Sequence, residues 1–331
     1  MIRVYFTSNS NNADFFKYND KIEIIDNPKC YFIGDKFYTN FDIVYTIDGN
    51  ELSIADIELI ELCKLNNIPI IGTYRYNKAI QYQILKNYDI YTPYTVYSNN
   101  GFDQEINANI ALLNEINDDE EIIVKMILGA RGWGQLKGKK LDILKLIYNN
   151  DVKKLVEKES CNETKYIEID VKKCELEEKQ NNIEEKYLEN LEYNNISYLE
   201  FRHCIIQKYE NNIQEYRVLL FYSGDKIVVE RNKNNWQGNA CNNDSGSSIV
   251  IDNKDIECTD FNLLEAKLRS IMKEYDYTCL SVDIFLNDKG FGVLEFQEEF
   301  GWTNTSAINS VELNKYMVNS LIKKVEDYGK K

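Results

Sequence analysis

The stretch 281–302, SVDIFLNDKGFGVLEFQEEFGW, contains three side chains whose oxygens could bind a metal ion. Apolar and polar residues alternate on both sides of residues 287–290, which predicts two strands joined by a turn. Asp283 lies on the first strand, and Glu295 and Gln297 share a face of the second because they are two residues apart. Such oxygens suit a hard cation such as Mg2+, which takes few protein ligands.

The second strand of this hairpin shows a regular spacing. Phe291, Val293 and Glu295 follow one another at intervals of two, which is the period of a strand. Acidic residues on hairpins are also common on plain solvated faces. The hairpin by itself is therefore compatible with either a metal site or a solvated face.

A second group of residues could bind an anion. Residues 121–126 predict a strand that includes Lys125, and the loop 128–135, LGARGWGQ, follows it. Backbone amides and cations of such a loop can wrap around a triphosphate. The loop differs from the GxxxxGK[ST] pattern because its lysine precedes the glycines, and a simple hairpin turn would explain the glycines as well.

The composition limits the class of protein. The chain has 331 residues, 44% of them apolar, which supports two or three domains with a substantial core. Its net charge of -15 argues against binding to a nucleic-acid backbone. No apolar run is long enough to predict a transmembrane helix, and the first residues lack the pattern of a secretory signal. A cytoplasmic location without membrane partners is expected.

Cysteine and histidine usage argues against several kinds of site. The eight cysteines include no CxxC pair, so we expect buried free thiols instead of a zinc site or a disulfide framework. His203 is the only histidine, and lone histidines are usually structural.

Residues 1–75 predict a small α/β unit with a partly parallel sheet. No GxGxxG follows its first strand, which excludes a dinucleotide fingerprint. The predicted elements are strands at 2–6, 21–25, 42–46 and 68–71 and a helix at 53–66.

The rest of the chain alternates between predicted helices and strands. Residues 141–203 are unusually charged, and they are either a solvated surface segment or a recognition insert for a partner. The predicted helices are 77–87, 141–157, 177–191 and 262–274, and the predicted strands are 121–126, 166–171, 204–209, 216–222 and 227–231.

Six blocks of this sequence carry a family resemblance. They are residues 76–78 with 83–86 and 91–95, residues 123–125 with 129–135, residues 206–209, residues 215–218, Arg231 with Asn239, and the acidic hairpin. In this order they resemble the ATP-grasp superfamily of carboxylate ligases, most closely its RimK-like branch, over roughly residues 70–325. The resemblance implies ATP and Mg2+ as cofactors and an acyl-phosphate intermediate.

The resemblance also implies a role for individual residues. The expected nucleotide-binding residues are Lys78, Lys125, Gly129, Arg131, Gly132, Gly134, the hinge residues Gln207, Lys208 and Tyr209, and Glu215 at the ribose. The residues expected at the transferred phosphate are Arg217, Arg231 and Asn239. The expected magnesium ligands are Asp283, Glu295 and Gln297.

The fold implied by the resemblance mixes α/β and α+β parts. A pre-ATP-grasp α/β domain is expected at 1–75. A central domain with the glycine-rich loop and the charged insert (141–203) is expected at 76–205. A C-terminal antiparallel-sheet domain with the metal site is expected at 206–331.

Two departures from the family pattern point to the substrate. Gln297 stands where asparagine is usual, and residues 298–302, EEFGW, replace a small residue followed by Pro-Gly. The Gly-Trp ending is closer to the graspetide synthetases, which link Asp or Glu side chains of a ribosomal peptide to Ser, Thr or Lys. By this analogy the insert would bind a leader peptide.

Two other functions are weighed against a peptide macrocyclase. One is a RimK-like ligase that adds amino acids to a small molecule or a protein terminus. The other is a nucleotide-binding protein that has lost catalysis. A homodimer is a candidate assembly, although the sequence does not determine the oligomeric state.

Overall fold

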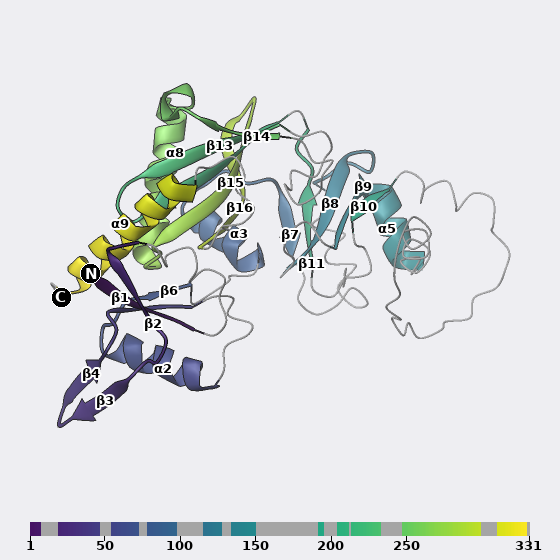
Figure 1. Ribbon diagram of the computed structural model, residues 1–331. Helices are drawn as coiled ribbons and strands as arrows, with labels where there is room; N and C mark the ends of the chain where they lie inside the picture. Colours follow the sequence, from purple (N-terminus) through teal and green to yellow (C-terminus); the bar gives the residue numbers. More distant parts are fainter. Residues whose placement is uncertain are drawn as a thin grey trace. The chain divides into compact units, whose positions relative to one another are not determined.

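The computed structural model describes most of the chain in two compact units (Figure 1). The described residues are 1–7, 19–46, 54–72, 78–97, 115–127, 134–149, 191–194, 204–211, 213–232, 247–298 and 310–329. The first unit comprises Met1–Tyr76, Ile84–Ile90 and Gln214–Lys331, and the second comprises Asn77–Gln83 and Tyr91–Ile213.

A four-stranded parallel sheet opens the first unit, in the order β2-β1-β5-β6. Its bounds are β1 Ile2–Phe6, β2 Ile22–Ile25, β5 Ile43–Tyr45 and β6 Ile70–Ile71, with helix α2 at Ile54–Leu65 between the last two strands. The predicted α/β unit with parallel strands is confirmed. Arg3 on β1 and Asp42 before β5 form an ion pair of 2.6 Å that links the two segments.

A five-stranded antiparallel sheet follows in the same unit, in the order β14-β13-β12-β15-β16. Its bounds are β12 Gln214–Phe221, β13 Lys226–Asn232, β14 Ser247–Ile251, β15 Cys279–Asn287 and β16 Gly290–Gln297. Three further helical segments are η3 Asn253–Asp255, α8 Thr259–Glu274 and α9 Ser310–Tyr328. Strand β14 is not among the strands predicted from the sequence.

Each face of this antiparallel sheet has its own core. One face, which includes Val218 and Ile284, packs against α8 and the end of helix α3 (Lys78–Asn87). The other face, which includes Leu219, packs against α9 and the parallel sheet. Residues from the segments predicted as N-terminal and C-terminal domains therefore share one core. The division into three domains stays a prediction.

The spacing predicted for β16 is wrong at one place. Asp283 pairs with Glu295 but Ile284 pairs with Val293, so a β-bulge leaves Leu294 without a partner residue on β15. Val293 lies in the core against α8, as does Phe296, three residues later. Glu295 consequently lies on the opposite face from Val293 because the extra residue shifts the alternation by one.

The second unit contains a separate antiparallel sheet in the order β10-β9-β8-β11-β7. Its bounds are β7 Thr95–Tyr97, β8 Glu121–Met126, β9 Gln135–Lys139, β10 Glu192–Asn194 and β11 Cys204–Lys208. Helix α5, Lys140–Asn149, packs Ile143 and Leu146 against one face of this sheet. Helix α5 confirms the first part of the helix predicted at 141–157. The predicted strand at 166–171 lies outside the described residues, and so does the predicted helix at 177–191 except for its last residue.

The described cysteines differ partly from the prediction. Cys63, Cys204 and Cys279 are buried free thiols as expected, whereas Cys30 and Cys258 are exposed. Burial raises the pKa of the Cys204 thiol to about 12, which keeps it protonated. None of the helices in the described ranges is both long and apolar enough to cross a membrane.

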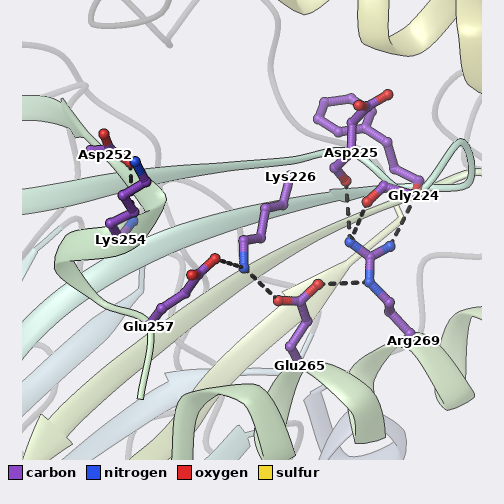
Figure 2. Close-up of polar contacts among 9 residues, drawn as sticks. Gly224, Asp225, Lys226, Asp252, Lys254, Glu257, Glu265 and Arg269 are labelled. Atoms are coloured by element: carbon purple, nitrogen blue, oxygen red, sulfur yellow. Dashed lines mark hydrogen bonds and ion pairs between the residues drawn. The ribbon is translucent and has the colours of Figure 1, made fainter. Parts of the chain in front are cut away.

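A polar network attaches α8 to the turn between β12 and β13 (Figure 2). Arg269 donates to the carbonyl oxygens of Gly224 at 2.9 Å and Asp225 at 3.3 Å. Glu265 accepts from Arg269 at 2.7 Å and from Lys226 at 2.8 Å. Burial raises the pKa of Glu265, but the bonds from Lys226 and Arg269 outweigh it and hold the pKa below its ordinary value.

We predict that Glu265→Gln lowers the free energy of unfolding by about 1–2 kcal/mol at neutral pH, because a charge-assisted pair of hydrogen bonds is lost. The folded-state pKa of Glu265 is depressed, so its stabilisation is present above the ordinary carboxyl pKa of 4.5 and is lost as the pH falls through the folded value. The difference in the midpoint of urea unfolding between wild type and variant should therefore narrow as the pH falls below 4.5.

The matched control for this prediction is Glu257→Gln. Glu257 contacts the same Lys226 at 3.2 Å, but its side chain is 44% exposed. Exposed pairs contribute little, so this variant should lose well under 1 kcal/mol. Equal losses for the two variants at neutral pH would contradict the prediction.

Candidate functional site

The face of the antiparallel sheet that packs against α9 changes from apolar to charged along its strands. On β12, Leu219 and Phe221 lie in the core with α9, while Glu215 and Arg217 precede them on the same face. Strand β13 shows the same change, since Val229 lies in that core and Arg231 follows on the same face. The strands thus carry a core at one end and a polar site at the other.

Asp283 is the centre of the charged end. Its two carboxylate oxygens accept from Nε and Nη2 of Arg217 at 2.7 and 2.8 Å, a bidentate pair. Arg231 donates from Nη1 to Oδ2 of the same carboxylate at 3.2 Å. Asp283 is only 10% exposed at its side chain and Arg231 only 9%. A buried carboxylate therefore lies between two guanidinium groups, that of Arg231 almost fully covered and that of Arg217 18% exposed.

Burial and neighbouring charges act against each other at Arg231. Desolvation lowers the pKa of Arg231, and Asp283 and Glu295 partly oppose this while Arg217 adds to it. Arginine nevertheless stays protonated because its ordinary pKa is above 12. The site thus holds two fixed positive charges next to two carboxylates.

Glu295 lies beside Asp283 because the two residues are paired across β15 and β16. The bulge at Leu294 is what brings Glu295 to the charged face. Gln297 is two residues further along β16, opposite Ser281, and it is exposed. The structure therefore places all three predicted metal ligands on one face of two adjacent strands.

The chemistry of these three ligands fits Mg2+, which uses one or two carboxylates and completes its shell with water and phosphate oxygens. Within the described ranges, no group of three or more His, Cys, Asp or Glu side chains could hold a metal ion. Both oxygens of Asp283 are also engaged by arginines. A cation at Asp283 would have to replace part of these arginine contacts.

The residue after Gln297 belongs to a buried network. Burial raises the pKa of Glu298 to about 7, while Lys324 and the backbone amides of Gly72 and Thr278 act in the opposite direction. Lys324 on α9 is fully buried and donates to Oγ1 of Thr278 at 2.9 Å. This network ties the end of β6 to the end of β16, directly next to the charged face.

In the second unit, Lys125 and the hinge residue Gln207 lie on the sheet face opposite α5. Lys125 on β8 donates from Nζ to Oε1 of Gln207 on β11 at 2.8 Å. The amide of Gln207 in turn donates to Oγ1 of Thr95 on β7 at 3.0 Å. Gln207 is 4% exposed, so its orientation is fixed by these two bonds.

The backbone of the predicted hinge is already used inside the unit. The amide of Lys208 donates to the Tyr94 carbonyl at 2.8 Å, and the amide of Tyr209 donates to the Glu121 carbonyl at 3.0 Å. The side chain of Lys208 binds Glu120 at 2.6 Å. Recognition of a base at this hinge would therefore use groups other than these two amides.

The sequence analysis missed Lys137. It lies on β9, is 7% exposed, and places Nζ 4.2 Å from the centre of the Tyr209 ring. It also forms ion pairs with Glu121 at 3.1 Å and Glu192 at 3.3 Å. The sequence QLKGK directly after the glycine-rich loop could have predicted this position. Strand alternation puts Leu136 on one face and Lys137 on the other.

The remaining predicted residues are only partly described. Gly134 adopts a left-handed conformation (φ 63°) at the end of the glycine-rich loop, which favours glycine there. Lys78 begins α3, and its amide donates to the Ile127 carbonyl at 3.1 Å. Gly129, Arg131, Gly132 and Asn239 lie outside the described residues.

Comparison with known proteins identifies the fold. A ligase from Chryseobacterium gregarium, described as a RiPP-associated ATP-grasp ligase in complex with ADP and a leader and core peptide, matches with a TM-score of 0.55. The identity is 12%, and the match covers 98% of this chain and 97% of the other. D-alanyl-alanine synthetase A from Vibrio cholerae matches with a TM-score of 0.57 at 11% identity, over 98% and 97% of the two chains.

A third similar structure is the macrocyclase MdnC from Microcystis aeruginosa, bound with precursor peptide MdnA. It matches with a TM-score of 0.51 at 13% identity, over 98% of this chain and 99% of the other. No protein-family model matches the sequence, and no curated protein matches it. The chain therefore has the ATP-grasp fold, as the sequence predicts.

We predict that Asp283→Asn destabilises the first unit by about 3 kcal/mol, because the variant leaves two largely covered guanidinium groups without their shared anionic partner. The measurement is the free energy of unfolding in urea. Asp288→Asn is the control, since Asp288 is exposed in the turn of the same hairpin. A loss for Asp283→Asn no larger than that of the control would contradict the charge-compensation argument.

Proposed function

We propose that this protein is an ATP-dependent ligase that activates a carboxylate as an acyl phosphate. The observation that carries the proposal is the charged end of the antiparallel sheet, where two arginines and two carboxylates lie together within an ATP-grasp fold. Phosphoryl transfer needs positioning and charge compensation more than covalent chemistry, and this arrangement supplies both.

The reaction has two steps with defined leaving groups. An oxygen of the substrate carboxylate attacks the γ-phosphorus of ATP, and ADP leaves. An amine or hydroxyl then attacks the acyl carbon, and inorganic phosphate leaves. The first step gathers negative charge around the transferred group, and Arg217 and Arg231 would stabilise this charge.

The contacts of Asp283 suggest how the site accepts its ligand. Asp283 and Glu295 would hold Mg2+, which neutralises phosphate charge when bound. The guanidinium groups of Arg217 and Arg231 would then pass from the carboxylate to phosphate oxygens. Neither arginine is left unpaired in this exchange, so its cost is lower than that of exposing a buried charge.

The second unit supports nucleotide binding by a different route. Lys125 is held by Gln207, and it is the lysine that directly precedes the glycine-rich loop. An ammonium group on a sheet face can bind phosphate oxygens as a point charge. We therefore assign Lys125 to the phosphates of ATP.

For the substrate we propose a ribosomal peptide whose Asp or Glu side chains become linked to Ser or Thr hydroxyls or to Lys amines. Two of the similar structures are complexes with a leader and core peptide or a precursor peptide. The Gly301-Trp302 ending and the charged insert point the same way. The second candidate is an amino-acid ligase, which the similarity to a D-alanyl-alanine synthetase favours.

Mass spectrometry separates these candidates. The protein would be incubated with ATP, Mg2+ and peptides encoded beside its gene. A macrocyclase removes one water from the peptide for each link, whereas an amino-acid ligase adds a residue to its acceptor. If no ADP is released with either peptides or amino acids, the ligase proposal itself is wrong.

We predict that Glu295→Gln lowers the rate of ADP formation by about 100-fold or more, because a preorganised charge next to the phosphates is lost. Glu312→Gln, at an exposed position on α9, should retain the wild-type rate. The measurement is the steady-state rate of ADP release with a peptide or amino acid that the wild type converts. Full activity of Glu295→Gln would exclude Glu295 from the site.

We predict that Lys125→Met weakens ATP binding by about 10- to 100-fold, the loss expected for one charge-assisted bond. Lys139→Met is a close control because Lys139 lies on the adjacent strand β9 and is exposed. Calorimetric titration with ATP and Mg2+ gives both dissociation constants. Comparable affinities for the two variants would remove Lys125 from the nucleotide site.

A further inference from the structure

Three neighbouring strands of the second unit carry a row of hydrogen-bonded side chains. The strands β7, β11 and β8 are adjacent in the sheet (Figure 1). Thr95 on β7 pairs directly with Gln207 on β11. Lys125 on β8 lies one diagonal step further, because Gln207 pairs with Ile123, two residues before the lysine. The three side chains therefore lie on the same face of the sheet.

The direction of each hydrogen bond in this row follows from its chemistry. The ammonium group of Lys125 can only donate, so the Gln207 side chain presents its oxygen to it, at 2.8 Å. The NH2 group of Gln207 then faces the hydroxyl oxygen of Thr95 at 3.0 Å, which accepts. The same hydroxyl donates its own proton to the Pro93 carbonyl oxygen at 2.9 Å. The orientation of each group is thus determined by the next one in the row.

Burial makes this order important. Gln207 is 4% exposed and Thr95 is 9% exposed, so water has little access to either side chain. A buried N–H group without an acceptor costs free energy because its hydration is lost without replacement. Without the Thr95 oxygen, the NH2 group of Gln207 would turn towards another acceptor. The oxygen of the same amide would then turn away from Lys125.

A neutral amide is well suited to holding a lysine that binds phosphate. A carboxylate at this position would pair with the ammonium group and cancel much of the charge that attracts phosphate oxygens. The amide of Gln207 restricts the position of Lys125 and leaves its positive charge in place. The Thr95 hydroxyl, which is also neutral, orients the amide in the same way.

We propose that Thr95 is a positioning residue of the nucleotide site, which acts on Lys125 through Gln207. This inference rests on the proposed function, since it takes Lys125 as a ligand of the ATP phosphates. A cation that is held in place binds more tightly because less entropy is lost when the ligand arrives. The alternative role of Thr95 is purely local, in which its hydroxyl only satisfies the Pro93 carbonyl.

Calorimetric titration of the full chain with ATP and Mg2+ tests the proposal. Thr95→Val removes the hydroxyl but keeps the shape of the side chain, and it should weaken ATP binding about 5- to 10-fold. Thr95→Ser keeps the hydroxyl and should bind ATP like the wild type. In a Lys125→Met background, Thr95→Val should cause no further loss, because the residue on which it acts is absent.

Thr92→Val is the matched control. Thr92 lies three residues earlier in the same unit, and its buried hydroxyl oxygen has no hydrogen-bond partner among the described residues. This variant should keep the wild-type affinity for ATP. Urea unfolding of each variant shows that it is folded under the conditions of the titration.

Three results would overturn the positioning role and leave the ligase proposal intact. They are wild-type affinity in Thr95→Val, an equal loss in Thr95→Ser, and a loss from Thr95→Val that is undiminished in the Lys125→Met background. A wild type that binds no ATP would instead contradict the proposed function, and the positioning role would fall with it.

Discussion

The charged end of the first unit's antiparallel sheet depends on the ion pairs that the buried carboxylate of Asp283 forms with Arg217 and Arg231. A buried charge is tolerated only with an opposite partner at hydrogen-bonding distance, and here two guanidinium groups provide it. Arg217 and Arg231 come from two other strands of the same sheet. The register of β12, β13 and β15 is therefore constrained by charge at one end and by apolar packing at the other.

This division lets one sheet serve as both scaffold and site. One face has an apolar centre that packs against α8, with polar residues such as Lys226 at its edge, so the strands are held from this side. Its second face is apolar only where α9 and the parallel sheet cover it. Side chains at the charged end are consequently fixed by a rigid backbone, which is the condition for electrostatic preorganisation.

The second unit follows the same principle with different groups. Gln207 has no charge, yet its bonds to Lys125 and Thr95 fix the position of the lysine. Lys137 is held by two carboxylates and an aromatic ring. In both units the cations are oriented by neighbouring side chains, which under the proposed function would lower the cost of binding a polyphosphate.

The sequence by itself determined the elements that carry the site, because strand alternation and turn chemistry are local properties. The hairpin of Asp283 and Glu295, the strand of Arg217 and the fold class all follow from such local patterns and from the order of the blocks. Only the tertiary structure decided the bulge at Leu294 and the pairing of Arg217 with Asp283, 66 residues apart. Both depend on which strands become neighbours, and a bulge is decided by the cross-strand partner and not by the residues on either side of it.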